Sequence, residues 1–219
     1  MRGILVDWVI EVHLRFKLLP ETLFLTVNLI DRYCEKQQVH RTRLQLVAVA
    51  AMLIASKYEE IYAPMVRDFV YITDNAYTRE EILEMESRML TEFEFDITNP
   101  TSYRFLERFA QVCDTPTQLW YLAQYLIELP LIEQRMLSYT PSNIAASALY
   151  LARKILMRKE GQWTAELQRH TGYTEEQLRS CAKDMCILIT CIEKCSLQAV
   201  RKKFSTKKFH EVALIKIEN

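Results

Sequence analysis

The sequence predicts an all-α protein, and three observations carry this prediction. Only 3 glycines and 6 prolines occur among the 219 residues, so few positions suit tight hairpin turns. Apolar residues recur at the three- and four-residue spacing that marks one face of a helix. The third observation is that one helical pattern is written twice, which indicates two helical bundles of roughly 100 residues each.

The two copies of this pattern are offset by 96 (115 − 19) or 97 (145 − 48) residues. The matched pairs of segments are 19–33 with 115–129, 48–57 with 145–154, and 77–82 with 173–178. Proline meets proline in the first pair, and alanines and a lysine coincide in the second. In the third pair, a threonine is followed three residues later by Glu81 or Gln177, which is the capping box that starts a helix. The prolines, the alanines with the lysine, and the capping boxes match in the same order in both copies. This agreement favours a tandem duplication over chance similarity between helices.

Each copy is expected to contain five helices. In the first copy they lie near 2–16, 21–35, 42–58, 64–71 and 79–93. In the second copy they lie near 101–112, 116–129, 141–157, 163–170 and 175–194. The alanine-rich third helix of each copy should lie at the centre, because small residues let neighbouring helices approach closely. The copies should separate near 96–102, since Pro100 cannot continue a helix.

The composition argues against two classes of partner. With 28 basic and 28 acidic residues the net charge is zero, so the protein has no overall attraction for nucleic acid. No apolar run reaches the ~20 residues that span a bilayer, and no signal-peptide pattern opens the sequence. One basic cluster, RKKFSTKKFH (201–210), suits a nucleic-acid or nuclear-targeting patch, but we interpret it as a solvated helix end or tail.

The cysteines and histidines indicate neither a metal site nor a catalytic centre. Cys181 and Cys195 would lie ~21 Å apart on a helix, too far to bind one ion. We therefore interpret the cysteines as small buried apolar residues in a reducing compartment. No glycine-rich phosphate loop, Gly-x-Ser-x-Gly elbow or zinc-binding His–Glu helix occurs, so we expect no cofactor and no enzymatic activity.

Several sequence blocks resemble the cyclin family along nearly the whole chain. These blocks are MRGILVDWVIEVH (1–13), ETLFLTVNLIDRY (21–33), LQLVAVAAMLIASKYEEIYAP (44–64), FVYITDNAYT (69–78) and TGYTEEQL (171–178). LLPETLF, ASKYEEIYAP and YLIELPLIEQRML resemble the mitotic B-type branch in particular. The resemblance implies two tandem five-helix cyclin boxes, residues 1–98 for kinase and substrate docking and 99–219 for the second box with a short tail. Cyclins also carry a preceding helix and a degradation signal, so we expect this sequence to be part of a longer protein.

The resemblance assigns a kinase-binding role to the charged end of the alanine-rich helix. Lys57 would donate hydrogen bonds to backbone carbonyls around the PSTAIRE-type helix of a cyclin-dependent kinase, and Glu86 would accept them from nearby N–H groups. The positions that surround this contact are Tyr58, Glu59, Ile61, Leu90 and Phe95. The alternative is a solvated helix end. Glu59 and Glu60 at a helix C-terminus oppose the helix dipole without evident compensation, which favours a functional role.

A second surface is expected on the first helix, where Met1, Ile4, Leu5 and Trp8 form an apolar stripe opposite other apolar residues. In cyclins the matching residues dock Arg-x-Leu motifs of substrates and inhibitors. The remaining residues of this docking patch are Glu11, Arg41, Leu44 and Gln45. Glu11 would pair with the arginine of the motif. A fully buried first helix would give the same pattern. Gly3 stands where alanine is frequent and should add backbone freedom.

The resemblance therefore implies a non-catalytic regulatory subunit that binds and activates a cyclin-dependent protein kinase. It would also recruit substrates in mitotic cell-cycle control, in the nucleus and cytoplasm, without binding nucleic acid or membrane. Two alternatives share the fold: a cyclin-box transcription factor that binds DNA and polymerase machinery, and a helical scaffold with no kinase partner. The Lys57/Glu86 pair and the neutral charge favour the regulatory subunit.

Overall fold

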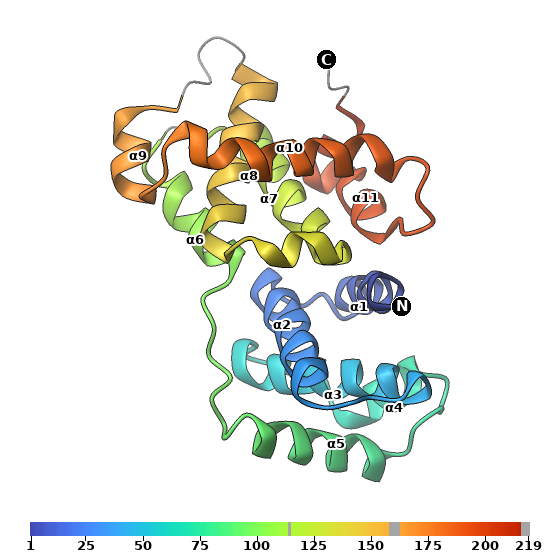
Figure 1. The fold of residues 1–219 in the computed structure, drawn as a ribbon. Coiled ribbons are helices and arrows are strands. Elements are labelled where there is room, and N and C mark those ends of the chain that lie inside the picture. The colour runs from blue at the N-terminus through green and yellow to red at the C-terminus, as the bar shows by residue number, and fades with distance from the viewer. Residues whose placement is uncertain (114, 158–162, 216–219) are drawn as a thin grey trace. The chain divides into compact units, whose positions relative to one another are not determined.

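The computed structural model describes residues 1–113, 115–157 and 163–215, and every regular element among them is a helix (Figure 1). The all-α prediction is confirmed. The chain forms two compact units, one comprising Met1 and Trp8–Asn99 and the other comprising Arg2–Asp7 and the chain from Pro100 onward. Within the described residues, no helix is both long and apolar enough to cross a membrane.

The first unit is built around α3. Its helices are the later part of α1 (Arg2–Phe16), α2 (Pro20–Lys36), α3 (Leu44–Glu59), α4 (Val66–Ile72) and α5 (Arg79–Glu92). All α3 side chains from Leu46 to Ser56 are buried, and the helix packs against α2, α4 and α5. Alanines at several of these positions allow this close approach on more than one side, so the expected central position of the alanine-rich helix is confirmed.

The second unit repeats this arrangement around α8. Its helices are α6 (Ser102–Ala110), α7 (Thr117–Glu128), α8 (Pro141–Met157), α9 (Ala165–Thr171), α10 (Glu175–Ile192) and α11 (Ala199–Phe204). The α8 residues from Ala145 to Arg153 are buried, and α8 packs against α6, α7 and α10. Short 3-10 helices lie at Arg41–Arg43, Leu129–Ile132, Gln134–Ser138, Lys207–Phe209 and Val212–Leu214. Among the residues that the structure describes, the five expected helices of each copy are present, with α11 as an addition.

The duplicated capping boxes start equivalent helices. At α5 the Thr78 hydroxyl accepts from the Glu81 N–H at 3.2 Å, and the Glu81 carboxylate accepts from the Thr78 N–H at 3.1 Å. At α10 the Thr174 N–H donates to Gln177 Oε1 at 2.8 Å, and the Gln177 N–H donates back to the hydroxyl. Each pair satisfies backbone donors that the first helical turn leaves without partners.

Gly3 has a different role from the one expected. A Cβ atom at Gly3 would lie 2.9 Å from the carbonyl oxygen of Ile132 and 3.0 Å from Leu197 Cδ1. In the same unit, Arg2 Nη1 donates to the Leu131 carbonyl at 2.8 Å. The start of α1 therefore lies directly against the Leu129–Ile132 turn. Lack of a side chain at residue 3 matters here because it permits this close approach, rather than because it adds backbone freedom.

The basic cluster at 201–210 is only in part the solvated helix end or tail that the sequence indicated: Lys202, Lys207 and Lys208 are exposed, but Lys203 is buried. Lys203 lies in α11 with its side chain only 4% exposed, and its Nζ donates to both carboxylate oxygens of Glu128 on α7, at 2.6 and 2.8 Å. Phe204 is fully buried, with its ring centroid 5.5 Å from that of Tyr125 and 4.8 Å from that of Phe209. The end of the described chain is therefore packed into the second unit.

The cysteines are also less uniformly buried than expected. Cys181 is buried, but Cys34 and Cys191 are exposed and the other three are half-buried. All six are free thiols. Burial raises the pKa of the Cys181 thiol to about 11, against the opposing effect of a hydrogen bond with Ser147. No group of three or more histidine, cysteine or acidic residues arranged to hold a metal ion occurs among the described residues.

Candidate protein-binding site

An ion pair joins the two residues at the centre of the predicted kinase-binding site. Lys57 lies in the last turn of α3, and its Nζ donates to the Glu86 carboxylate oxygens on α5 at 2.7 and 2.8 Å. The Glu86 side chain is 11% exposed, whereas that of Lys57 is 51% exposed. The carboxylate is thus fixed in place by α3. The ammonium group keeps an exposed side from which it can donate to an external carbonyl.

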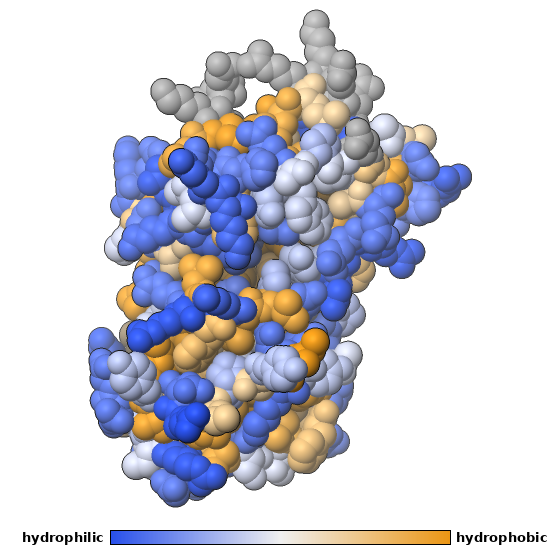
Figure 2. Space-filling view, turned by 180° about the vertical axis from the view of Figure 1, so that it is seen from behind, coloured by the Kyte–Doolittle hydropathy of each residue, from blue (hydrophilic) through white to orange (hydrophobic). Residues whose placement is uncertain are grey.

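Large apolar side chains that follow this pair in the sequence, at and after the end of α3 and after α5, are not buried. The exposed fractions are 49% for Tyr58, 89% for Ile61 and 71% for Phe95. Tyr62, which the sequence analysis did not include, is 92% exposed directly beside Ile61. Leu90 and Glu59 are half-buried. Figure 2 shows that apolar residues reach the surface among hydrophilic ones on the face that it displays. Exposed apolar and aromatic side chains beside a charged pair are typical of protein-binding surfaces.

The loop after α5 is tied to α3 at its far end. The Tyr58 hydroxyl and the Thr98 hydroxyl lie within hydrogen-bonding distance, at 2.8 Å. Between α5 and Thr98, the residues Glu94 and Phe95 have φ angles of 51° and 61°. Phe95 therefore lies in a turn with left-handed backbone, between the end of α5 and the Tyr58–Thr98 contact with α3.

Glu60 has a structural role that the sequence analysis missed. Its Oε1 accepts from the Leu19 N–H at 2.7 Å and from the Thr22 hydroxyl at 2.5 Å. Leu19 is the N-cap of α2, so the Glu60 carboxylate binds at the positive end of that helix dipole. The expectation that Glu60 lacks compensation is therefore wrong. The unfavourable position at the end of α3 is offset by a favourable one at the start of α2.

The residues of the predicted docking patch do not all belong to one unit. Ile4 and Leu5 belong to the second unit, and the remaining members belong to the first. Met1 and Ile4 are 58% and 65% exposed, Glu11 and Arg41 are exposed, and Leu5, Trp8, Leu44 and Gln45 are half-buried. By contrast, Val6, Val9 and Ile10 are completely buried. The α1 helix thus has one buried apolar face and one that remains partly accessible, so it is not buried on all sides.

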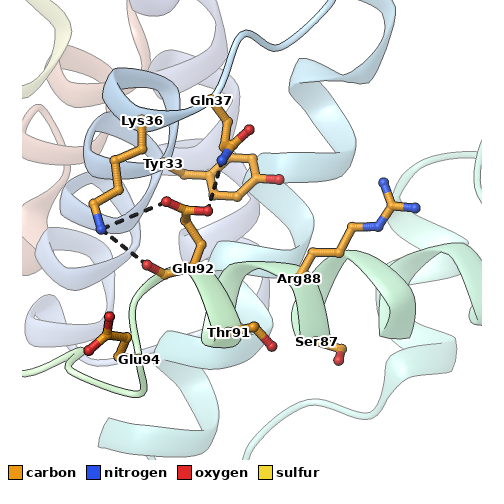
Figure 3. A pocket seen from close by; sticks show the side chains of 8 residues that line it. All are labelled: Tyr33, Lys36, Gln37, Ser87, Arg88, Thr91, Glu92 and Glu94. Carbon is orange, nitrogen blue, oxygen red and sulfur yellow. Dashed lines mark hydrogen bonds and ion pairs between the residues drawn. The ribbon is translucent and has the colours of Figure 1, made fainter.

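A polar pocket of about 610 Å³ lies at the ends of α2 and α5, and no sequence pattern indicated it. It is lined by Tyr33, Lys36, Gln37, Ser87, Arg88, Thr91, Glu92 and Glu94. Figure 3 shows Lys36 and Gln37 converging on Glu92. Gln37 Nε2 donates to the Glu92 carboxylate at 2.8 Å, and Lys36 Nζ donates to the Glu92 carbonyl at 3.1 Å. These bonds hold the ends of the two helices together beside the predicted kinase-binding residues.

Comparison with known families decides what kind of protein carries this site. The family model described as "Cyclin, N-terminal domain" matches residues 1–98, and "Cyclin, C-terminal domain" matches residues 100–218. The chain belongs to the cyclin family. The resemblance noted from its sequence blocks is therefore confirmed, and the two helical units are cyclin domains.

Relatives of this cyclin include B-type and A-type cyclins. A G2/mitotic-specific cyclin-B of Hydra vulgaris is 49% identical over 98% of this chain and 59% of its own length. Cyclin-A1-1 of Arabidopsis thaliana is 48% identical over 97% of this chain and 47% of its own length. The chain thus spans about half the length of these relatives. The crystal structure of a viral cyclin from herpesvirus saimiri superposes on this chain with a TM-score of 0.72 and 22% sequence identity. The alignment covers 85% of each of the two chains, and this similarity supports the fold alone.

Proposed function

We propose that this cyclin binds a cyclin-dependent protein kinase through the surface formed by Lys57, Glu86 and their apolar neighbours, and thereby activates it. The kinase face, as we call it, consists of Lys57, Tyr58, Glu59, Ile61, Glu86, Leu90 and Phe95. The observation that carries the proposal is the Lys57–Glu86 pair at 2.7 Å, together with the 89% and 71% exposure of Ile61 and Phe95. An isolated solvated helix end gives no reason for such apolar exposure both after α3 and in the turn after α5.

The proposed mechanism is a shift in the conformation of the kinase. Backbone carbonyls and N–H groups around the PSTAIRE-type helix would bind Lys57 and Glu86, which complement carbonyls and N–H groups respectively. If this cyclin binds the inward position of that helix more tightly than the outward one, it shifts the kinase towards its active state. The inward position completes the Lys–Glu pair that orients the ATP phosphates, so all catalytic groups belong to the kinase.

The same cyclin is proposed to recruit proteins that carry Arg-x-Leu motifs. Met1, Ile4 and Trp8 offer apolar area for the leucine, and the exposed carboxylate of Glu11 suits the arginine guanidinium. We assign the resulting complex to mitotic control in the nucleus and cytoplasm. The similarity to a G2/mitotic-specific cyclin-B supports this assignment.

Binding affinity tests the proposal, and the duplicated chain supplies a matched control. Lys154 stands in the second copy where Lys57 stands in the first, and it forms a comparable half-exposed ion pair with Glu175 at 3.2 Å. Calorimetric titration of a purified cyclin-dependent kinase should show that Lys57→Ala weakens binding about tenfold or more, because a charge-assisted hydrogen bond is lost. Lys154→Ala should leave the dissociation constant unchanged.

Two results would overturn the proposal. A parent chain that binds none of a panel of cyclin-dependent kinases, but binds duplex DNA with a steep salt dependence, would favour the transcription-factor alternative. Equal kinase affinities for the parent, Lys57→Ala and Glu86→Ala would remove the kinase face from any role in binding, and a parent that binds neither kinase nor DNA would favour the helical scaffold.

A further inference from the structure

We propose that Arg32 on α2 is a positioning residue for Phe95, because it fixes the turn after α5 in the conformation that exposes the Phe95 ring. This inference rests on the proposed kinase-binding function and deepens it. Arg32 itself lies outside the kinase face, on α2, and contacts the residues on either side of the Glu94–Phe95 pair.

The turn itself has an unfavourable backbone. Glu94 and Phe95 adopt φ angles of 51° and 61°, and a left-handed conformation costs roughly 1–2 kcal/mol for each residue that has a Cβ. Such angles are especially uncommon for bulky residues. Three backbone bonds close the turn: the Glu94 N–H donates to the Thr91 carbonyl at 3.0 Å, the Phe95 N–H to the Leu90 carbonyl at 2.9 Å, and the Asp96 N–H to the Phe93 carbonyl at 2.8 Å. The 71% exposure of Phe95 means that burial of its own ring does not compensate for the strain.

Arg32 contacts both sides of this turn. Its Nη2 donates to the carbonyl of Asp96, the residue after Phe95, at 2.8 Å. Its guanidinium carbon also lies 4.7 Å from the ring centroid of Phe93, which is buried. One planar cation therefore links the residue before the strained pair to the residue after it. This is an interaction that a shorter or non-planar side chain cannot make in full.

Two further side-chain contacts fix the flanks of the turn. One helical turn after Arg32, Lys36 donates to the Glu92 carbonyl at 3.1 Å (Figure 3). On the α3 side, Tyr58 and Thr98 are joined at 2.8 Å. The turn is thus held through the backbone carbonyls of residues 92 and 96 and the side chain of Thr98, while the side chain of Phe95 remains exposed. An aromatic group held in this way is pre-organised, so a partner does not have to order the turn on binding.

A double-mutant cycle against the same kinase tests this inference. Phe95→Ala should weaken binding about thirtyfold or more, as expected for an aromatic anchor at an interface. Arg32→Ala should weaken binding by about tenfold in the parent, because the free turn then samples other conformations. In the Phe95→Ala background, Arg32→Ala should have no further effect, since no ring remains to be positioned. Arg79→Ala is the control, because Arg79 is exposed at the start of α5 and pairs only with the neighbouring Glu80 among the partners that the structure describes.

Amide hydrogen exchange gives an independent readout in the free protein. Arg32→Ala should accelerate exchange at Phe95 and Asp96, while amides in the first half of α5 keep their parental rates. If Arg32→Ala does not fold, Arg32→Lys gives the same comparison, because it keeps the charge but not the planar group.

The outcomes separate this inference from the proposed function. Parental affinity of the Arg32 variant, or an equal loss in the presence and absence of Phe95, would overturn the positioning role while leaving the kinase face intact. Failure of the parent to bind any kinase would overturn the proposed function, and the inference with it.

Discussion

Removing one partner of the buried Lys203–Glu128 pair should strongly destabilise the second unit. The two side chains are 4% and 2% exposed, so solvent cannot replace a lost partner. Loss of one member of such a pair costs about 3–5 kcal/mol, mainly because the other charge stays buried without compensation. At about 2–4 °C per kcal/mol for a chain of this size, Lys203→Met should lower the Tm by roughly 10 °C. The double variant Lys203→Met with Glu128→Leu should recover most of the loss, since apolar pairs often replace buried ion pairs without cost.

The pH dependence of the single variant distinguishes this explanation from a simple packing defect. Burial raises the pKa of Glu128, and the ammonium of Lys203 opposes that rise through its charge and its hydrogen bonds. Without Lys203 the pKa rises further. Between the unfolded pKa and this raised folded pKa, the folded state binds the proton and the unfolded state does not. The stability of Lys203→Met therefore falls as pH rises through that window, at up to about 1.4 kcal/mol per pH unit.

Urea unfolding from pH 5 to pH 8, followed by circular dichroism, would measure this effect. The difference between the parent and Lys203→Met should be largest at pH 8 and should narrow towards pH 5, while the double variant shows no such trend. A single variant as stable as the parent at pH 8, or a deficit that does not change with pH, would refute the electrostatic reasoning.

Three further predictions concern local features. Gly3→Ala should cost about 1–3 kcal/mol in urea unfolding, because its Cβ would lie 2.9 Å from the Ile132 carbonyl oxygen; parental stability would show that the contact is relieved easily. Thr174→Ala should cost about 1 kcal/mol and Thr174→Ser much less, because serine keeps the capping hydroxyl; equal unfolding midpoints for the two would contradict this. Burial raises the pKa of Cys181 to about 11, so iodoacetamide at pH 8 should label the exposed Cys191 well before Cys181, and mass spectrometry showing equal labelling rates would disagree.

Much of the fold could be predicted because its signals are local. Helical spacing, the prolines at 20 and 116 and the threonine boxes at 78 and 174 predict helix positions within a few residues of those observed. The α11 helix was missed because six residues are too few to show a clear period. Its basic composition also indicated a segment exposed to solvent. Nothing in the sequence indicates that Lys203 pairs with Glu128, 75 residues away.

For the candidate site, the sequence selects residues but does not indicate their geometry. The family resemblance selected Lys57, Glu86 and Phe95, yet no local pattern indicated that the first two form an ion pair. Glu60 illustrates the same limit. Its position at the end of α3 is unfavourable by the helix-dipole rule, and only the fold shows that it caps α2. The contact of Arg32 with the turn around Phe95 likewise joins segments that are far apart in sequence, and periodicity carries no information about it.

The most direct test of the central claim is the activity of an inactive cyclin-dependent kinase, measured on a histone substrate while this cyclin is titrated in. The account predicts saturable activation by the parent and by Lys154→Ala, and loss of activation by the double variant Lys57→Ala with Glu86→Ala. Equal activation by the double variant would contradict the proposed kinase face, and no activation by the parent would contradict the proposed function itself.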